Sequence, residues 1–338
     1  MDKKQAGILG ASAWLARELA QWLKKWRFPY DIVLFDEAEE CGKTLEYQNQ
    51  YYPIHRYNDE ALFACTIVFD CVGKADELLD TKAQERMWIL RLCGCDKVGK
   101  LVLPSLNLET ISKEDHNLRI PTAAFAMFAM ILSVLKTKHT LQRSVLTSLH
   151  SVAEVGDEGC KDLLEQLRAY ASGQEPESDV FPLKNAYQHL PLLFQTIPQT
   201  SDFCDGGSSE EELRFQSNLE QVLDTSLDIC ATCVRVAGLR GLSMSLAFLC
   251  EEEVDPEAIT DLFAQDPNMI CFDDITHNMY PICADVIHDY RVYIGRMRRS
   301  DPHVLAMWAV CDDLALRCGI AVKTAFYVIH NFIEKDCG

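Results

Sequence analysis

The sequence predicts an α/β chain of two domains: a doubly wound parallel sheet, then an α+β domain with a mixed or antiparallel sheet. Short apolar strands alternate with helical segments at the start of the chain, and strand candidates cluster without regular crossover helices in the rest. At roughly 150 residues per domain, 338 residues suggest two domains. We expect the first domain at 1–118, completed by a helix at 315–338, and the second at 119–314.

The elements of the first domain follow from its apolar runs. Strands that alternate with helices at this spacing form a parallel sheet, because each right-handed crossover returns the chain to begin the next strand in the same direction. Strands are predicted at 6–9, 31–35, 64–71 and 100–103, and helices at 14–26 and 75–92.

The second domain begins with the longest apolar run of the chain, at 121–135 (PTAAFAMFAMILSVL). The run is shorter than the roughly 18 residues of a membrane span, and Lys136 and Lys138 close it, so we expect a buried core helix. Further helices are predicted at 160–171, 208–224 (capped by Ser208 or Ser209) and 315–334, a polar loop at 172–179, and strands at 144–149, 229–236, 244–249, 292–297 and 307–311.

The charge balance excludes two classes of partner. Asp and Glu number 51 against 32 Lys and Arg, for a net charge of −19. Such a polyanion repels phosphate backbones and anionic lipid surfaces, so we expect neither a nucleic-acid nor a membrane partner.

Fifteen cysteines are well above ordinary usage, and disulfides, a metal site or core packing would explain them. Disulfides need an oxidising compartment, and the N-terminus has no apolar signal segment, so a cytoplasmic protein is expected. Cys230 and Cys233 have a zinc-like spacing, but no second ligand pair follows them, and no metal is expected. Most thiols flank apolar residues, as Cys65 and Cys71 do, which favours core packing.

A partial dinucleotide-binding motif, 10–16 (GASAWLA), lies where the first predicted strand meets the first helix. Gly10 permits the tight turn and Ala16 is tolerable where helix and strand pack, but Ala13 adds a methyl group where a pyrophosphate approaches the backbone. The helix N-terminus would still attract an anion, so nucleotide binding is left open. The candidate cofactor-binding residues here are Gly10, Ala11, Ser12, Ala13 and Trp14.

Segments along nearly the whole chain resemble aspartate-semialdehyde dehydrogenases, in the order of that family. The resemblance implies a Rossmann-type first domain and a second domain that forms a homodimer through its sheet. It is greatest to the Usg-type branch, which lacks the family's nucleophile. The segments are 10–16 (GASAWLA), 28–29 (FP), 41–43 (CGK), 145–150 (VLTSLH), 185–186 (NA), 197–198 (IP), 210–214 (EEELR), 231–236 (ATCVRV), 239–241 (LRG) and 295–298 (GRMR).

The resemblance implies that the reacting groups of the family are missing. Its cysteine nucleophile opens the helix that begins here at Pro121, where Thr122 or Pro121 stands instead. A hydroxyl cannot form the thioester intermediate. The family's catalytic histidine corresponds to Leu242, and the glutamine that positions the acyl intermediate corresponds to His150, which is either a displaced base or a structural histidine.

The resemblance implies that the family's substrate-binding groups are better preserved in this chain than its reacting groups. Arg240 matches the arginine that holds the substrate carboxylate, Arg214 replaces a phosphate-binding lysine, and Glu211 matches the carboxylate that meets the substrate amine. The alternative is that all three are ordinary surface charges. A second phosphate-binding arginine of the family has no counterpart.

The acidic loop at 36–40 (DEAEE) bears on the cofactor. Its carboxylates would repel the 2′-phosphate of NADP, whereas a single acid such as Asp36 can bind the ribose 2′-hydroxyl of NAD. No cofactor is certain; NAD is compatible with the loop and NADP is disfavoured.

These observations favour a catalytically degenerate, dimeric homologue of aspartate-semialdehyde dehydrogenase that binds a small anionic metabolite or a nucleotide, or regulates another protein. The alternative is an active NAD(P)-dependent semialdehyde dehydrogenase with a non-standard nucleophile such as Cys160 or Cys233. An NAD-binding sensor is a third hypothesis. Physiological ligand, pathway and protein partners are not determined by the sequence.

Overall fold

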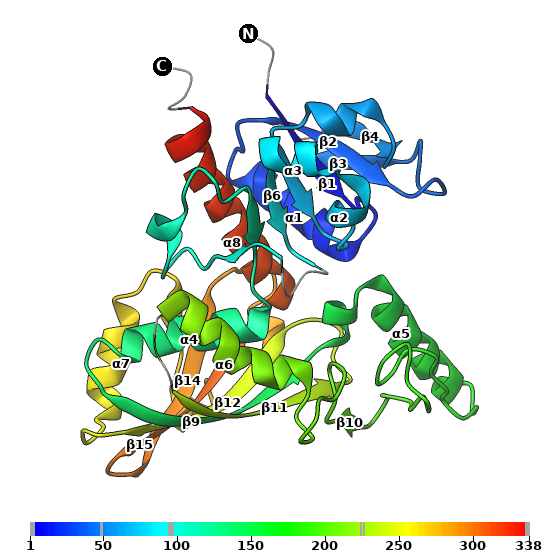
Figure 1. Cartoon of the computed structure of the whole chain (residues 1–338). Helices are drawn as coiled ribbons and strands as arrows, with labels where there is room; N and C mark the ends of the chain where they lie inside the picture. Colours follow the sequence, from blue (N-terminus) through cyan, green and yellow to red (C-terminus); the bar gives the residue numbers. More distant parts are fainter. Residues whose placement is uncertain (1–3, 48–49, 94–97, 224, 226, 335–338) are drawn as a thin grey trace. The chain divides into compact units, whose positions relative to one another are not determined.

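The computed structural model describes residues 4–47, 50–93, 98–223, 225 and 227–334, and these fall into two compact units. Unit 1 comprises Met1–Pro121 and Arg317–Gly338, and unit 2 comprises Thr122–Leu316. Figure 1 shows the elements of both units along the chain. The predicted helix end at Asp224 and the tail at 335–338 lie outside the described residues.

Unit 1 is built on an eight-stranded sheet in the order β3-β4-β2-β1-β5-β6-β8-β7. Every neighbouring pair is parallel except β3 and β4, which form an antiparallel edge hairpin. This confirms the predicted parallel sheet. The strands are β1 (Gln5–Leu9), β2 (Asp31–Asp36), β3 (Thr44–Tyr47), β4 (Gln50–Arg56), β5 (Ile67–Asp70), β6 (Trp88–Arg91), β7 (Lys100–Leu101) and β8 (Asn117–Arg119).

The helices of unit 1 include α1 (Trp14–Lys25), α2 (Ala75–Leu78) and α3 (Thr81–Arg86). The C-terminal helix α8 (Asp313–Val328) begins in unit 2 and continues into unit 1, as the predicted helix at 315–334 required. Each residue of β5 and β6 is buried, as expected for parallel strands with helices on both faces.

The predicted helix at 75–92 is wrong. The chain forms α2 and α3 there and then the buried strand β6. Leu79 is extended between the two helices, and the Asp80 carboxylate starts α3 by accepting the Ala83 N–H at 2.8 Å. A short apolar run does not distinguish a buried strand from a buried helix, and β6 is such a run.

Unit 2 is built on a seven-stranded sheet in the order β10-β11-β9-β12-β15-β14-β13. The pairs β9–β11 and β13–β14 are parallel and the other pairs antiparallel, so the predicted mixed sheet is confirmed. The strands are β9 (Leu141–His150), β10 (Thr196–Ile197), β11 (Asp228–Val236), β12 (Leu242–Cys250), β13 (Met269–Cys271), β14 (Val292–Asp301) and β15 (Val304–Cys311).

Three helices cover one face of this sheet: α4 (Ala123–Leu135), α6 (Glu210–Leu223) and α7 (Pro256–Ala264) (Figure 1). The predicted core helix is α4, in which every residue except Ser133 is buried. Thr122 is its N-cap and accepts the Phe125 N–H at 3.4 Å. A side chain at the start of α4 is therefore fixed in position by the helix itself.

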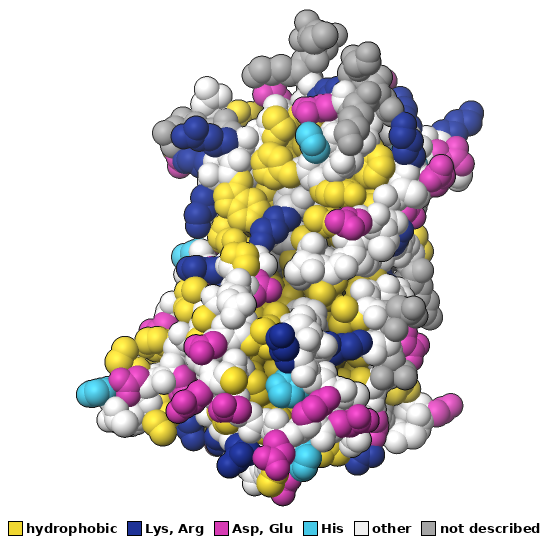
Figure 2. Space-filling view, turned by 90° about the vertical axis from the view of Figure 1, so that its left-hand side faces the viewer, with side chains coloured by type: hydrophobic (Ala, Val, Ile, Leu, Met, Phe, Trp, Pro, Cys, Tyr) yellow, Lys and Arg dark blue, Asp and Glu magenta, His cyan; other side chains and the backbone are white. Residues whose placement is uncertain are grey.

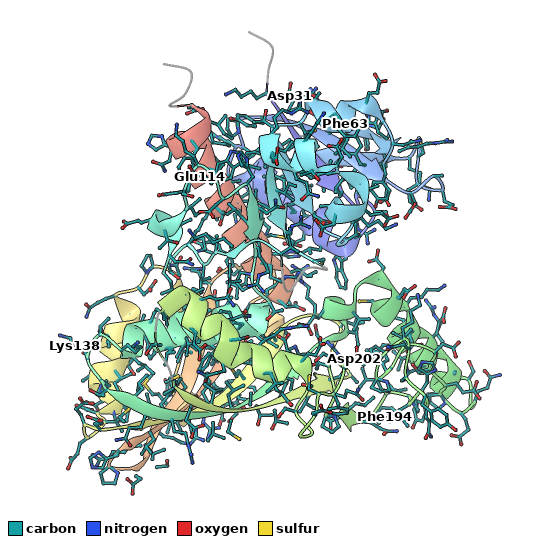
Figure 3. All side chains as sticks on the ribbon, in the orientation of Figure 1. Asp31, Phe63, Glu114, Lys138, Phe194 and Asp202 are labelled. Atoms are coloured by element: carbon teal, nitrogen blue, oxygen red, sulfur yellow. The ribbon has the colours of Figure 1, made fainter. Side chains whose placement is uncertain are left out.

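The helix α5 (Asp157–Ala171) and the loop after it form a smaller cluster in unit 2. Phe194, on this loop beside α5 in Figure 3, contacts the Tyr170 ring at a centroid distance of 4.8 Å. The buried residues of the cluster are Val152, Leu163, Phe181, Leu192 and Ile197.

The surface carries both signs of charge. Figure 2 shows acidic and basic side chains interspersed over the visible face, with apolar side chains between them. Within the described ranges, no helix combines the length and the apolar character that crossing a bilayer would demand.

Candidate functional site

Charged and polar side chains meet in unit 2 where β9 and β11 end and α4 and α6 begin. Because β9 and β11 pair in parallel with Ser148 opposite Cys233 and His150 opposite Arg235, these four side chains share one face of the sheet. The group, which we call the charge cluster, comprises Thr122, Ser148, His150, Glu154, Glu211, Arg214, Cys233 and Arg235.

Glu154 lies at the centre of the charge cluster. Its Oε2 accepts from Arg235 Nη1 at 2.9 Å and is 2.8 Å from His150 Nδ1. His150 is 1% exposed and Arg235 3%. Burial acts to raise the pKa of Glu154, but the charges and hydrogen bonds of His150 and Arg235 outweigh it and hold that pKa well below its usual range. The carboxylate therefore stays ionised.

A hydrogen-bonded chain leads from His150 to a thiol. His150 Nε2 is 2.7 Å from Ser148 Oγ, and Ser148 Oγ is 3.3 Å from Cys233 Sγ. Cys233 is wholly buried, and burial raises the pKa of its thiol far above the usual range. The group is a protonated thiol, not the thiolate that attacks a carbonyl.

Glu211 joins the start of α4 to α6. Thr122 Oγ1 donates to its Oε1 at 2.8 Å, and Arg214 Nη1 donates to its Oε2 at 3.3 Å. Burial, and next the negative charge of Glu154, raise the pKa of Glu211 above its usual value. The cluster thus holds one carboxylate that is firmly ionised and one that retains its proton more readily.

Arg235 has one guanidinium nitrogen that is buried without an acceptor in the described part of the chain. Its Nη1 donates to Glu154 and, at 2.8 Å, to the Ser151 carbonyl. Its Nε is buried and has no hydrogen-bond partner within the described part of the chain. A buried donor without an acceptor is costly, and the edge that carries Nε is one on which a guanidinium takes a carboxylate.

Arg240 is engaged elsewhere. Its Nε donates to Asp312 Oδ1 at 3.0 Å, and its Nη2 lies 2.6 Å from Asp312 Oδ2, so the two residues form a buried ion pair. Asp312 also accepts the His288 N–H at 2.7 Å and caps the start of α8 through the Leu314 and Ala315 N–H groups. The pair therefore fastens three segments of unit 2 together.

Leu242, the predicted counterpart of a catalytic histidine, is the first residue of β12 and is 2% exposed. It pairs directly with His150 on β9. Directly opposed residues project to the same face, so an apolar side chain adjoins the imidazole there.

The predicted cofactor loop lies in unit 1 between β1 and α1. Gly10 has φ +77°, and a Cβ there would lie 2.2 Å from Val72 Cγ1, so only glycine fits. The Gly10 and Ala11 N–H groups donate to the Phe35 carbonyl at 2.9 and 3.1 Å. The Ser12 N–H donates to Asp36 Oδ2 at 2.6 Å. These N–H groups already have acceptors inside the chain.

Asp36 is buried at the end of β2. Its Oδ1 accepts the Glu37 N–H at 2.8 Å and the Tyr57 hydroxyl at 3.3 Å. Burial first, and the charges of Asp36 and Glu37 next, raise the pKa of Tyr57 far above its usual value. Lys74 is ion-paired with Glu37. Asp36 and Glu37 thus both place negative charge near the Tyr57 hydroxyl.

Asp70, which sequence reasoning missed, fills a backbone cradle at the end of β5. Its Oδ1 accepts the N–H groups of Val72, Gly73 and Lys74 at 3.2, 2.8 and 3.1 Å, and its Oδ2 accepts that of Ala75 at 2.9 Å. Successive N–H groups in such a turn form an anion site, which here holds the protein's own carboxylate.

These contacts test how a dinucleotide fits unit 1. Ala13 at the start of α1 makes no side-chain cap, which leaves the first turn of the helix suited to a pyrophosphate. Asp36 would accept a ribose hydroxyl by exchanging its bond with Tyr57. Ser12 and the 72–75 cradle would offer an N–H only if Asp36 and Asp70 moved away. As they stand, the residues of unit 1 therefore suit a ribose hydroxyl, through Asp36, and a phosphate, through the first turn of α1.

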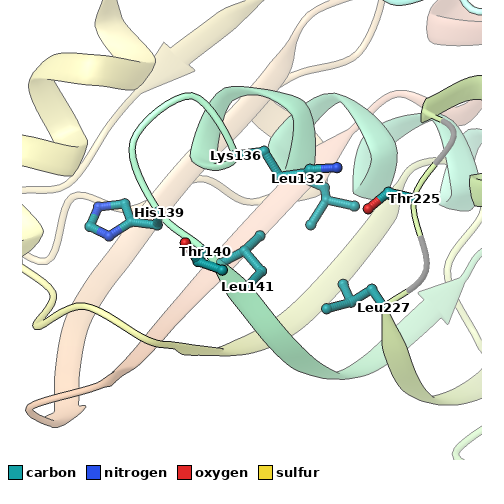
Figure 4. A pocket seen from close by; sticks show the side chains of 7 residues that line it. All are labelled: Leu132, Lys136, His139, Thr140, Leu141, Thr225 and Leu227. Carbon is teal, nitrogen blue, oxygen red and sulfur yellow. The ribbon is translucent and has the colours of Figure 1, made fainter.

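A cavity of about 250 Å³ lies where α4 ends and β9 begins. Lys136, His139 and Thr225 line it with four other residues, and none of the seven belongs to the charge cluster (Figure 4). Within the described ranges no three His, Cys, Asp or Glu side chains are grouped as a metal ion would need.

Sequence reasoning missed Glu154, Ser148 and Arg235. A signal was present for Arg235, which is a charged residue inside the strand predicted at 229–236 and needs a partner where that strand is buried. Glu154 gives no such signal, since only the short 3-10 helix η3 (Val152–Val155) turns it back toward His150.

Comparisons with known proteins agree with this architecture. Residues 132–316 match the family model described as semialdehyde dehydrogenase, dimerisation domain. The aspartate-semialdehyde dehydrogenase of Helicobacter pylori (strain J99) is 26% identical over 98% of this chain and 100% of its own length. That of Bacillus subtilis (strain 168) is 23% identical over 91% of this chain and 92% of its own.

Solved structures show the same fold. Aspartate semialdehyde dehydrogenase II of Vibrio cholerae superposes with a TM-score of 0.89 at 20% identity, over 98% of this chain and all of that one. The Candida albicans aspartate semialdehyde dehydrogenase, solved with NADP, superposes with a TM-score of 0.69 at 14% identity, over 97% and 98% of the two chains. The chain belongs to the semialdehyde dehydrogenase family, whose dimerisation domain it contains.

Proposed function

We propose that this chain is a catalytically degenerate member of its family, similar to the Usg-type branch, that binds a small anionic metabolite and forms no thioester. The observation that carries the proposal is Thr122. It caps α4, where the family resemblance implies that Thr122 or Pro121 stands at the nucleophile position, and its hydroxyl donates to Glu211. Cys233, the thiol of the charge cluster, is buried and protonated. The cluster therefore supplies charges that bind, without a nucleophile that reacts.

The ligand is a small molecule with a carboxylate and an amine. The buried Nε of Arg235, which has no acceptor in the described part of the chain, suits the carboxylate, and Glu211 and Glu154 suit the ammonium group. We assign the carboxylate to Arg235 in place of Arg240, because Arg240 is ion-paired with the buried Asp312. Glu211 and Arg214 keep the binding roles that the family resemblance implies.

For the cofactor, we propose that any dinucleotide bound is NAD. Asp36 is an acceptor suited to a ribose hydroxyl, and Lys74, a cation near it, is neutralised by Glu37. A 2′-phosphate would meet Asp36 and Glu37 with no unpaired cation from Lys74. The chain would differ in this from the Candida albicans protein that was solved with NADP.

The dimerisation domain supports a homodimer in which the uncovered face of the unit 2 sheet packs on its copy. That face carries Val145, which is 48% exposed, and the neighbouring exposed residues Cys230 and Ser245. Replacing Val145 by Asp would place a charge inside such an interface. Sedimentation of this variant as a monomer is expected; an unchanged dimer would contradict this face as the interface.

The central test is an activity assay with aspartate semialdehyde, phosphate and either NAD or NADP, followed at the absorbance of the reduced nicotinamide. The native chain is expected to show no turnover. The Thr122→Cys, Leu242→His double variant restores the thiol and the imidazole, and is expected to gain a measurable rate. Calorimetric titration with aspartate should show binding to the native chain and at least tenfold weaker binding to R235Q.

Turnover by the native chain that disappears in one Cys→Ser variant would overturn the proposal that the chain is catalytically degenerate. It would favour the alternative, an active NAD(P)-dependent semialdehyde dehydrogenase. The observation in favour of that alternative is the Cys233–Ser148–His150 hydrogen-bonded chain, so C233S is the first variant to assay and C160S the second.

A further inference from the structure

A second pocket in unit 2 shares no residue with the charge cluster. It has a volume of about 310 Å³ and lies between β14 and the segment before it, which contains the 3-10 helix η4 (Ile275–His277). This size is at the lower end of small-molecule sites. Its lining residues are Ile275, Asn278, Tyr280, Arg296, Met297 and Arg298.

A β-bulge creates the pocket. The pairing of β14 with β15 shifts register between Gly295 and Arg298, and Arg296 has φ +53°. A bulge re-aims the side chain at its centre, and Arg296 accordingly projects as an exposed residue. A left-handed backbone at a residue other than glycine is strained, and such strain gathers at binding sites.

The bulge is held firmly. The Met297 N–H donates to Asp273 Oδ2 at 2.8 Å, and Arg298 Nη1 donates to the Arg296 carbonyl at 2.9 Å. A Cβ at Gly295 would lie 2.5 Å from both the Phe272 carbonyl oxygen and Pro281 Cδ, so the preceding segment packs directly on the strand. The pocket is therefore formed before any ligand arrives.

The pocket carries positive charge that no acidic side chain among the described residues balances. In the described parts of the chain neither Arg296 nor Arg298 forms an ion pair, although the net charge is −19. The acids of the adjoining segment have other partners: Asp273 accepts from Met297, and Asp274 from Thr276 and His277. Two exposed guanidinium groups without carboxylates, in an acidic protein, mark a place suited to an anion.

The rest of the lining is apolar or aromatic. Ile275 is 65% exposed and Tyr280 38%, and Met297 lies between the two arginines. An inorganic ion would leave these side chains without a contact. A ligand with an anionic head and an apolar body would cover them and pair with the guanidinium groups.

We propose that the β14 bulge is a binding site for a small organic anion with a phosphate or carboxylate head and an aromatic or branched apolar body. Arg296 and Arg298 hold the head, and Tyr280, Ile275 and Met297 contact the body. The site goes beyond the proposed function, because it uses neither the charge cluster nor the cofactor loop.

The test is calorimetric titration of the full chain with phenyl phosphate, with benzoate and with the uncharged benzyl alcohol. The structure predicts saturable binding of one or both anions and none of the alcohol. The R296N, R298Q double variant should weaken that binding at least tenfold; asparagine is chosen because it tolerates a left-handed backbone. The matched control is K136Q, which removes a cation from the other cavity and should bind like the native chain.

Phenyl phosphate binding without benzoate binding assigns a phosphate head, and the converse a carboxylate. The proposal is overturned if neither anion binds the native chain at millimolar concentration, or if the double variant binds as the native chain does. Equal loss in K136Q and in the double variant would also overturn it, because the effect would then be one of net charge. R235Q separates this test from the proposed function, since it should leave binding at the bulge unchanged.

Discussion

Both units bury carboxylates near the ends of their strands, but in different ways. In unit 1, Asp36 and Asp70 are held by backbone N–H groups of the loops that would face a nucleotide. In unit 2, Glu154 is held by the side chains of His150 and Arg235. Backbone donors satisfied in this way are closed to a ligand, whereas the Nε of Arg235 has no acceptor in the described part of the chain. Unit 2 is therefore better prepared to bind an anion than unit 1.

The largest effect is expected when the central carboxylate of the charge cluster, that of Glu154, is removed. Glu154→Ala leaves Arg235 buried without its counter-charge and His150 Nδ1 without its hydrogen-bond partner, and breaking a buried ion pair costs about 3–5 kcal/mol. Urea unfolding measures the loss. The matched control is Glu158→Ala, whose exposed pair with Lys184 is worth about 1 kcal/mol at most. Equal losses would contradict the central place of Glu154.

In unit 1 the corresponding change is Asp70→Ala. Four N–H groups lose their acceptor, and water can reach some of them, so we expect a loss of about 3 kcal/mol in the free energy of unfolding. D70N keeps one acceptor oxygen and should lie between D70A and the native chain. A D70A variant as stable as D70N would show that the cradle does not depend on the carboxylate.

A smaller effect is expected at the start of α4. Thr122→Ala removes the N-cap and the hydroxyl that donates to Glu211, at a cost of about 1–2 kcal/mol. T122S keeps the hydroxyl and is expected to be nearly neutral. If T122S loses as much as T122A, the methyl group, not the hydroxyl, is what the site needs.

The smallest expected effect is on the pH dependence of stability, to which the two carboxylates of unit 2, Glu154 and Glu211, contribute in opposite ways. The pKa of Glu154 is lowered by folding, so its contribution is present above the ordinary glutamate pKa and lost as the pH falls below it. The pKa of Glu211 is raised, so its contribution is present below that ordinary pKa and lost as the pH rises through the raised one.

Urea midpoints measured from acid to neutral pH follow both groups. Glu211→Gln should remove the part of stability that declines toward neutral pH, and should therefore be relatively more stable there than in acid. Glu154→Gln should instead flatten the decline in acid. A pH profile that is the same in E211Q and the native chain would contradict the raised pKa of Glu211.

The sequence predicts most of the strands and helices, but few of the contacts within the charge cluster. Strands such as β1 and β2 are short apolar runs beside glycine and charged residues, and this local pattern is enough to predict them. The predicted helix at 75–92 failed because a buried strand has the same apolar composition as a buried helix. Thr122 and Glu211 are 89 residues apart in sequence, so their hydrogen bond depends on tertiary packing that no local pattern encodes.

The family resemblance predicted the residue types near the charge cluster, but not their partners. Arg240, which the resemblance places at the ligand, is ion-paired with Asp312. Arg235, five positions earlier, has a buried Nε without an acceptor in the described part of the chain. The choice between these two arginines depends on which carboxylates lie beside each in the fold, and Asp312 is 72 residues from Arg240 in sequence.

The proximity of Glu211 to Glu154 has a consequence for an anion that carries no amine. Such an anion beside Arg235 adds a negative charge close to the ionised Glu154, where Glu211 already retains its proton unusually well. Binding should then take up a proton from the solution. The heat of binding would depend on the ionisation enthalpy of the buffer, and affinity would fall as the pH rises. The charge cluster would thus couple metabolite binding to acidity without any catalytic step.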